Sequence, residues 1–169
     1  MLGRDYVGQN CSIARALEVV GERWTLLIVR DALRGFSRFD QFAARLNLAP
    51  STLTTRLNRL VEEGVMERRP YQERPRRNEY LLTERGRALL PVVLSLMDWG
   101  DRFLATAGAP ALASHRGCGG LISPDTSCAT CGQRVEPARI EWLPGPGADE
   151  DDGASEVRPR DSEGHPAPR

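Results

Sequence analysis

The 169-residue sequence contains no lysine, so all 23 of its basic side chains are arginines. It also lacks any run of about eighteen apolar residues, the length that a membrane-spanning helix needs. The first ten residues, MLGRDYVGQN, lack the apolar core of a signal peptide. We therefore expect a cytoplasmic protein without a membrane partner. The length suits one good core with extra segments better than two large domains.

The sequence also lacks the patterns that are typical of enzymes. It shows no nucleophile paired with a base, no phosphate-binding glycine loop and no site of paired carboxylates. We therefore expect a binding protein and not an enzyme.

The formal net charge is zero, but the charges are unevenly distributed. Residues 1–107 hold 17 arginines against 13 acidic residues, and residues 108–169 hold 6 against 10, so the two parts carry +4 and −4. Residues 34–77 alone hold 10 arginines against 5 acidic residues. This local excess favours an anionic partner, and the planar guanidinium of arginine suits phosphate and guanine.

Residues 49–75 are the most informative stretch. At about 100° per residue, one helical face carries leucines and the opposite face carries hydroxyl and guanidinium groups. The apolar face comprises Leu53, Leu57, Leu60 and Val61, and the polar face carries Ser51, Thr52, Thr55 and Arg59. Ser51 can act as the N-cap and Gly64 can end the helix, which is predicted over about 51–63. The polar face has no carboxylate and suits base edges and phosphates, so we interpret it as a recognition helix.

A hairpin with a basic tip is predicted after this helix. Residues 65–71 and 79–82 have the pattern of two short strands, and the polar segment between them contains Pro75. The predicted tip carries Arg74, Arg76 and Arg77. Helix, strand, basic loop and strand is the order of a winged helix-turn-helix, in which the wing lies near the sugar-phosphate backbone.

Three helices are predicted before the recognition helix. They cover residues 12–20, 22–33 and 38–46, with Ser12 and Ser37 as N-caps and Gly21 and Gly35 at helix ends. Their predicted inward residues are Ile13, Ala16, Leu17 and Val20, then Trp24, Leu27 and Ile28, then Phe39, Phe42, Ala43 and Leu46. Residues 47–50 make the short connection of a helix-turn-helix.

A long helix capped by Thr83 is predicted over 84–108, with a kink or break at Pro91 because proline removes a backbone donor. Beyond Pro91, its apolar residues spread over more of the circumference than one small core needs. They are Val92, Val93, Leu96, Met97, Trp99, Phe103 and Leu104. We interpret part of this surface as the interface of a homodimer; the alternative is that it only closes the monomer core.

Cys11 stands at the predicted start of the first helix. There the positive end of the helix dipole favours the thiolate, which reacts with oxidants. The alternative is a small buried thiol, which is favoured by the absence of a second cysteine nearby.

A pattern H-x2-C-x9-C-x2-C lies within residues 115–142, where we predict a structural zinc knuckle. Its predicted ligands are His115, Cys118, Cys128 and Cys131. A disulfide, free thiols or an empty former site are the alternatives. A catalytic zinc is not expected, because four protein ligands leave no position for water. Residues 143–169 are rich in proline, glycine and acid, and we expect them to be disordered.

Four segments in order resemble the HxlR family of bacterial winged-helix transcription regulators, within the MarR/ArsR-like superfamily. They are CSIARALEVVGERWTLLIVRDAL, FSRFDQF, PSTLTTRLNRLVEEGVMERRPY and RNEYLLTERGRALLPVVLSLMDWG. The resemblance covers about residues 8–105 and implies a homodimer, built from the N- and C-terminal helices, that binds operator DNA. It also implies a cysteine at Cys11 that senses oxidants or electrophiles in some members, although the usual Cys-Pro is here Cys11-Ser12. Some members carry a C-terminal appendage similar to residues 115–132.

The mainly helical fold with a small hairpin wing and the resemblance to this family lead us to expect a regulator that binds double-stranded DNA. We predict a repressor, and an activator is the alternative. We assign phosphate contacts to Arg74, Arg76, Arg77 and the main-chain amides that begin at Ser51, and base reading to Thr52, Thr55, Arg56 and Arg59. An oxidant or a small molecule is the expected effector. A different class of function, a helical protein-protein interaction module that uses the long helix and the zinc knuckle, is the alternative.

Overall fold

The computed structural model describes residues 6, 10–115, 118, 120–122, 124, 127, 130–134 and 140. The chain forms two compact units, residues 1–124 and 125–169. The first unit contains α1 (Ser12–Val20), α2 (Thr25–Leu33), α3 (Phe39–Leu46), α4 (Pro50–Glu62), β1 (Met66–Glu73), β2 (Arg76–Leu82), α5 (Glu84–Arg87) and α6 (Leu90–Phe103). The predicted tail, 143–169, lies outside the described residues. In the part that the structure describes, no helix is long and apolar enough to span a membrane.

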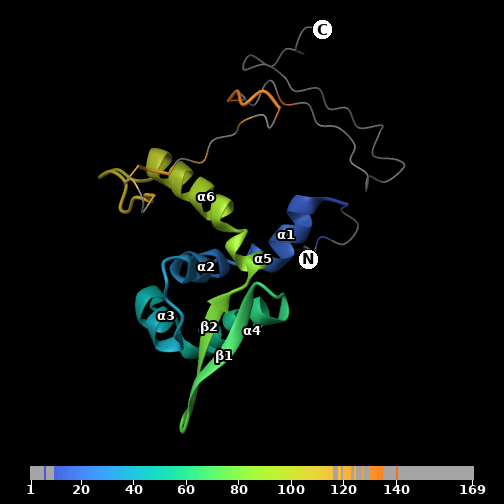
Figure 1. The fold of residues 1–169 in the computed structure, drawn as a ribbon, viewed down its shortest axis with the longest axis vertical. Coiled ribbons are helices and arrows are strands. Elements are labelled where there is room, and N and C mark those ends of the chain that lie inside the picture. The colour runs from blue at the N-terminus through green and yellow to red at the C-terminus, as the bar shows by residue number, and fades with distance from the viewer. Residues whose placement is uncertain are drawn as a thin grey trace, which may run out of the picture. The chain divides into compact units, whose positions relative to one another are not determined.

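The core lies between α2, α3, α4 and the base of the hairpin, which projects away from the helices (Figure 1). Fully buried side chains come from each of these elements: Ile28, Val29, Phe42, Leu53, Leu57, Leu60, Val65 and Met66. Burial of one such large apolar side chain contributes about 1.5–3 kcal/mol. The inward orientation predicted for the α3 phenylalanines and the α4 leucines is confirmed.

Two glycines end helices as predicted. Gly35 and Gly64 follow α2 and α4 with φ of +96° and +65°, a conformation that glycine adopts without steric cost. The Gly35 N–H donates to the carbonyl of Ala32, and the next N–H, of Phe36, reaches back to Asp31. This pair of bonds is the Schellman motif, which satisfies carbonyls at the end of the helix.

The predicted serine N-caps are wrong at three helices. Cys11 and not Ser12 is the N-cap of α1. The α4 helix begins one residue earlier than predicted, at Pro50, whose fixed φ suits a first helical position, so Ala49 is the N-cap. At α3 the N-cap is Arg38, and the side chain of Gln41 accepts from the N–H groups of Ser37 and Arg38. Tertiary contact explains the last case, because the Ser37 hydroxyl donates to Glu79 on β2.

The α2 helix begins three residues later than predicted. Glu22 to Trp24 form a turn in which the carbonyl of Glu22 accepts from the N–H of Thr25 at 3.0 Å. Trp24, predicted to face the core, is half-buried. The turn places Glu22 between α1 and α2, where its carboxylate can reach another element.

The wing is longer and its turn tighter than predicted. The strands β1 and β2 pair antiparallel from Met66 opposite Leu82 to Glu73 opposite Arg76, so only Arg74 and Pro75 form the turn. The prediction that Arg76 and Arg77 belong to a loop is therefore wrong. The register shifts between Pro70 and Gln72, and this irregularity lets the ladder continue past a proline that has no N–H to donate.

After the wing, Thr83 caps the next helix as predicted. Its hydroxyl accepts from the N–H of Gly86 at 3.2 Å and lies 2.7 Å from the carbonyl of Gly64. A Cβ at Gly86 would lie 2.2 Å from the carbonyl oxygen of Val65, so only glycine permits this close packing. The predicted break near Pro91 is confirmed, because α5 ends at Arg87 and α6 begins at Leu90.

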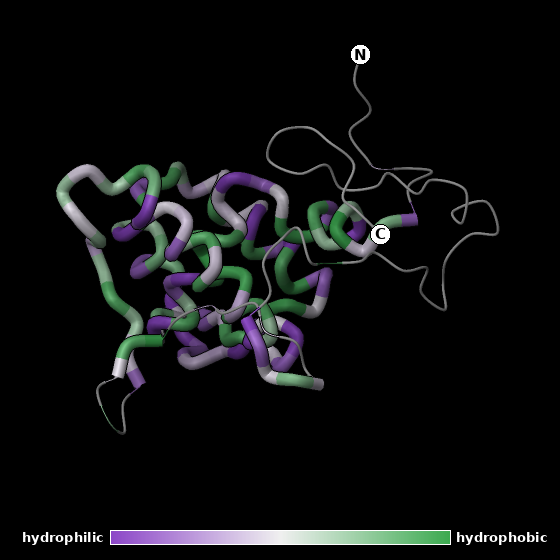
Figure 2. The backbone as a smooth tube through the Cα atoms, turned by 90° about the horizontal axis from the view of Figure 1, so that it is seen from above, coloured by the Kyte–Doolittle hydropathy of each residue, from purple (hydrophilic) through white to green (hydrophobic). Residues whose placement is uncertain are grey.

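Hydrophobic and hydrophilic residues alternate along the helices (Figure 2), but the apolar stripes of α1 and α6 are largely uncovered. In α1, Val20 is buried, whereas Ile13 and Leu17 are exposed. In α6, Leu94 is buried, and Leu96, Trp99 and Phe103 are 52%, 55% and 68% exposed. The rings of Trp99 and Phe103 lie 5.7 Å apart and form one apolar surface.

Candidate nucleic-acid interface

The centre of the candidate interface is the pair α3 and α4. They are joined by Asn47, Leu48 and Ala49, and Asn47 adopts the left-handed conformation (φ 48°, ψ 47°) that stops α3. The two helices contact each other and share the core through Phe42 and Leu57. Because the leucine face of α4 is buried, its opposite face is directed outward.

This outward face carries the predicted hydroxyl groups. Ser51 and Thr55 are exposed and Thr52 is half-buried. The Thr55 hydroxyl donates to the carbonyl of Ser51 at 3.0 Å, so its lone pairs remain free to accept a hydrogen bond. Pro50 has no N–H, and the N–H groups of Ser51 and Thr52 belong to the first helical turn, where no helical carbonyl precedes them. Such amides suit a phosphate oxygen.

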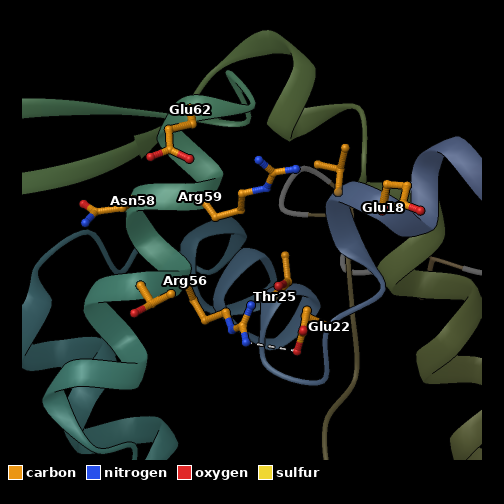
Figure 3. A pocket seen from close by; sticks show the side chains of 9 residues that line it. Glu18, Glu22, Thr25, Arg56, Asn58, Arg59 and Glu62 are labelled. Carbon is orange, nitrogen blue, oxygen red and sulfur yellow. Dashed lines mark ion pairs between the residues drawn. The ribbon is translucent and has the colours of Figure 1, made fainter. Parts of the chain in front are cut away.

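The two predicted base-reading arginines of α4 lie in different environments. Arg59 is half-exposed and pairs with Glu63 one turn along the same helix, at 2.7 Å. Surface pairs of this kind contribute little free energy, so DNA can displace the carboxylate. Arg56 is only 25% exposed and pairs with Glu22 of the α1–α2 turn at 3.1 Å (Figure 3). The outward geometry predicted for a reading arginine thus fits Arg59 better than Arg56.

The wing presents arginines to solvent. Arg74, Arg76 and Arg77 are exposed, and in the described part of the chain their side chains form no ion pair. Arg69, nearer the base of the hairpin, pairs with Glu67 at 2.7 Å. These three guanidinium groups lie at the wing tip, where we predicted the phosphate contacts.

The wing is held against the helices by residues that the sequence pattern did not predict as functional. Arg68 of β1 donates to Asn58 of α4, and Arg38 lies over the ring of Tyr71, 4.6 Å from its centroid. The N–H of Tyr80 also donates to the carbonyl of Ser37 at 2.7 Å. These contacts join elements that are far apart in sequence, so no local sequence pattern predicts them. They fix the wing relative to the recognition helix.

The predicted metal ligands are described only in part. In the first unit, His115 Nδ1 lies 3.3 Å from Cys118 Sγ, inside a turn that the bridge Ser114–Leu121 closes. In the second unit, Cys131 is exposed, precedes Gly132 (φ +69°) and lies inside a turn closed by the bridge Ser127–Arg134. Cys128 lies outside the described residues. Among those that are described, no three metal-binding side chains come together.

Cys11 is exposed at the N-terminus of α1. The alternative of a buried thiol is therefore wrong in this fold. Its carbonyl accepts from the N–H of Arg15 at 3.0 Å, which makes it the first residue to take part in the helix.

Two packed helices with a three-residue turn, an outward polar face on the second helix and an arginine-bearing hairpin define a winged helix-turn-helix protein. The model of the HxlR-like helix-turn-helix family matches residues 19–107, more than half of the chain. The chain belongs to this family and is a transcriptional regulator of the helix-turn-helix type.

Related proteins agree with this assignment. An HTH-type transcriptional regulator of Mycobacterium tuberculosis is 45% identical over 137 residues, which are 80% of this chain and 87% of the relative. The candidate transcription factor PA1607 is 34% identical in sequence, with a TM-score of 0.73 over 80% of this chain and 96% of that one. The redox regulator HypR in its oxidized form is 32% identical, with a TM-score of 0.51 over 54% of this chain and 96% of that one.

Proposed function

We propose that the protein is a homodimeric repressor that binds operator DNA sequence-specifically in the bacterial cytoplasm. One observation carries this proposal: the outward face of α4 and the wing, which carries exposed arginines at its tip, belong to elements that direct contacts hold together. In this arrangement α4 enters the major groove and the wing follows the backbone. A dimer that occupies two half-sites excludes other proteins from the same DNA, which is the basis of repression.

The interface has two kinds of contact. Arg74, Arg76 and Arg77, together with the first amides of α4, bind phosphates and supply most of the salt-dependent affinity without reading sequence. Thr52, Thr55 and Arg59 reach base edges, and an arginine bidentate to guanine contributes about 1–3 kcal/mol of discrimination. The dimer is supported by the uncovered apolar surface of α1 and α6.

Binding of the full chain to mixed-sequence duplex DNA at several salt concentrations tests the proposal. Each phosphate contact steepens the decrease of log K with log salt by about 0.9, so three wing arginines alone contribute about 2.7 per protomer. Absence of binding at low salt, or binding independent of salt, would contradict the proposal. That result would favour the protein-protein interaction module instead.

We also propose a structural zinc ion on His115, Cys118, Cys128 and Cys131. The H-x2-C-x9-C-x2-C spacing in the sequence supports it. Metal analysis of the full chain should find about one zinc per chain, lost in Cys131→Ser and kept in Cys11→Ser. Equal zinc in both variants, or none in the unmodified protein, would refute this site.

We propose that Cys11 makes DNA binding responsive to oxidants; a small-molecule effector is the alternative. Support comes from the exposed thiol at a helix N-terminus and from the similarity to the redox regulator HypR. A mild oxidant should change the operator affinity of the unmodified protein but not that of Cys11→Ser. The Cys131→Ser variant should respond like the unmodified protein. A response that persists in Cys11→Ser would remove this cysteine from the mechanism.

A further inference from the structure

Arg56 differs from the other arginines of the predicted DNA-binding face because an acidic side chain from outside the helix-turn-helix holds it. Its terminal nitrogen lies 3.1 Å from Glu22 Oε2, and Glu22 follows α1 directly after Gly21. The Arg56 side chain is 25% exposed, and its Nε is buried without a hydrogen-bond partner among the described residues. The guanidinium is thus drawn against the protein at the cost of one unsatisfied donor.

The pair borders a cavity of about 400 Å³ between α4 and the α1–α2 segment (Figure 3). Thr55 and Arg59 also line this cavity, so it adjoins the face of α4 that is predicted to read bases. In Figure 3, Arg56 and Arg59 both extend from α4 toward the segment that carries Glu18 and Glu22, but only Arg56 reaches a carboxylate there. Arg59 pairs within its own helix.

We propose that Glu22 is a specificity-determining residue: its carboxylate keeps Arg56 out of the set of arginines that contact DNA. This inference rests on the proposed DNA-binding function. A freed Arg56 on the flank of α4 would gain a phosphate contact, which carries no sequence information and strengthens binding to every duplex. By holding Arg56, Glu22 preserves the ratio between operator binding and non-specific binding.

The exposure of the Glu22–Arg56 ion pair also determines how strongly Glu22 can hold Arg56. Glu22 is 59% exposed, and partly exposed ion pairs contribute at most about 1 kcal/mol, which corresponds to about fivefold in an equilibrium constant. The pair is therefore strong enough to bias the position of Arg56 and weak enough that a shift of α1, which ends two residues before Glu22, would release it.

The test compares Glu22→Gln with Glu62→Gln in the full chain. Glu62 lines the same cavity and forms no ion pair with any described residue, so its variant reports the loss of one negative charge alone. Relative to Glu62→Gln, we expect Glu22→Gln to bind mixed-sequence duplex about two- to fivefold more tightly at low salt. The slope of log K against log salt should steepen by about 0.9 per protomer, and the preference for operator should decrease.

The same substitution in an Arg56→Gln background completes a double-mutant cycle. There Glu22→Gln should behave like Glu62→Gln, because no guanidinium remains to be released. Two results would overturn the proposal. One is that Glu22→Gln and Glu62→Gln have equal effects on DNA binding in the protein that keeps Arg56. The other is that Glu22→Gln weakens DNA binding and leaves the salt slope unchanged. Failure of the unmodified protein to bind DNA would instead refute the proposed function itself.

Discussion

Replacement of Trp99 and Phe103 together by aspartate is expected to convert the proposed homodimer into a monomer. Its affinity for an operator with two half-sites should decrease at least about 100-fold, because a monomer loses the effective concentration that links the second half-site to the first. Both side chains are more than half exposed on α6 and pack on each other. Two carboxylates in a desolvated apolar interface cannot be accommodated without partners.

Sedimentation equilibrium and operator titration measure the two parts of this prediction. Arg102→Ala is a matched control, because Arg102 lies on the same helix and is exposed. Among the described residues it pairs only with Asp98 of that helix, at 3.0 Å. The control should remain dimeric. The double variant should keep the thermal stability of the helix-turn-helix core, since neither ring is part of that core. A double variant that stays dimeric would contradict the assigned interface.

Arg59→Ala and Arg76→Ala are expected to weaken DNA binding in different ways. Arg59 lies on the outward face of α4, and loss of a contact to guanine should reduce the preference for operator by about 1–3 kcal/mol, or roughly 5- to 150-fold. Arg76 lies on the wing without an ion pair among the described residues, so its loss should weaken operator and mixed-sequence DNA about equally. The slope of log K against log salt should become shallower by about 0.9 per protomer.

Parallel titrations of each variant on operator and on mixed-sequence duplex separate these effects. Melting temperatures show whether both variants fold, which is expected because neither side chain is buried. Normal operator binding by both variants at physiological salt would show that the recognition surface lies elsewhere. The opposite result is that Arg76→Ala loses specificity and Arg59→Ala loses only salt-dependent affinity. It would assign base reading to the wing and phosphate contact to α4.

Residue periodicity predicted the architecture because the spacing of apolar residues along the chain determines which face of a helix is buried. The leucines of α4 recur at helical spacing and are buried, and the glycines after α2 and α4 end those helices. Thr83 is a predicted cap that forms. In each of these cases, neighbouring residues in the chain determine the outcome.

The predictions that failed concern side chains whose predicted role is prevented by another residue, either adjacent or distant in the sequence. Ser51 loses its predicted capping position to Ala49, because Pro50 occupies the first position of the helix. Ser37 loses its cap because Glu79, 42 residues away, takes its hydroxyl. The arginine pattern of α4 likewise could not distinguish Arg56 from Arg59, since the carboxylate that holds Arg56 is on another element. The local sequence thus identified candidate residues for capping and for DNA contact, whereas tertiary contacts determine which of them are free to act.

Methylation interference on operator DNA tests the central claim most directly, namely that the outward face of α4 lies in the major groove. Methylation of guanine N7, which faces the major groove, should block binding at two clusters about 10 base pairs apart, one for each protomer. Methylation of adenine N3 in the minor groove should have little effect within those clusters. Interference confined to the minor groove, or absent from both grooves, would contradict the placement of α4.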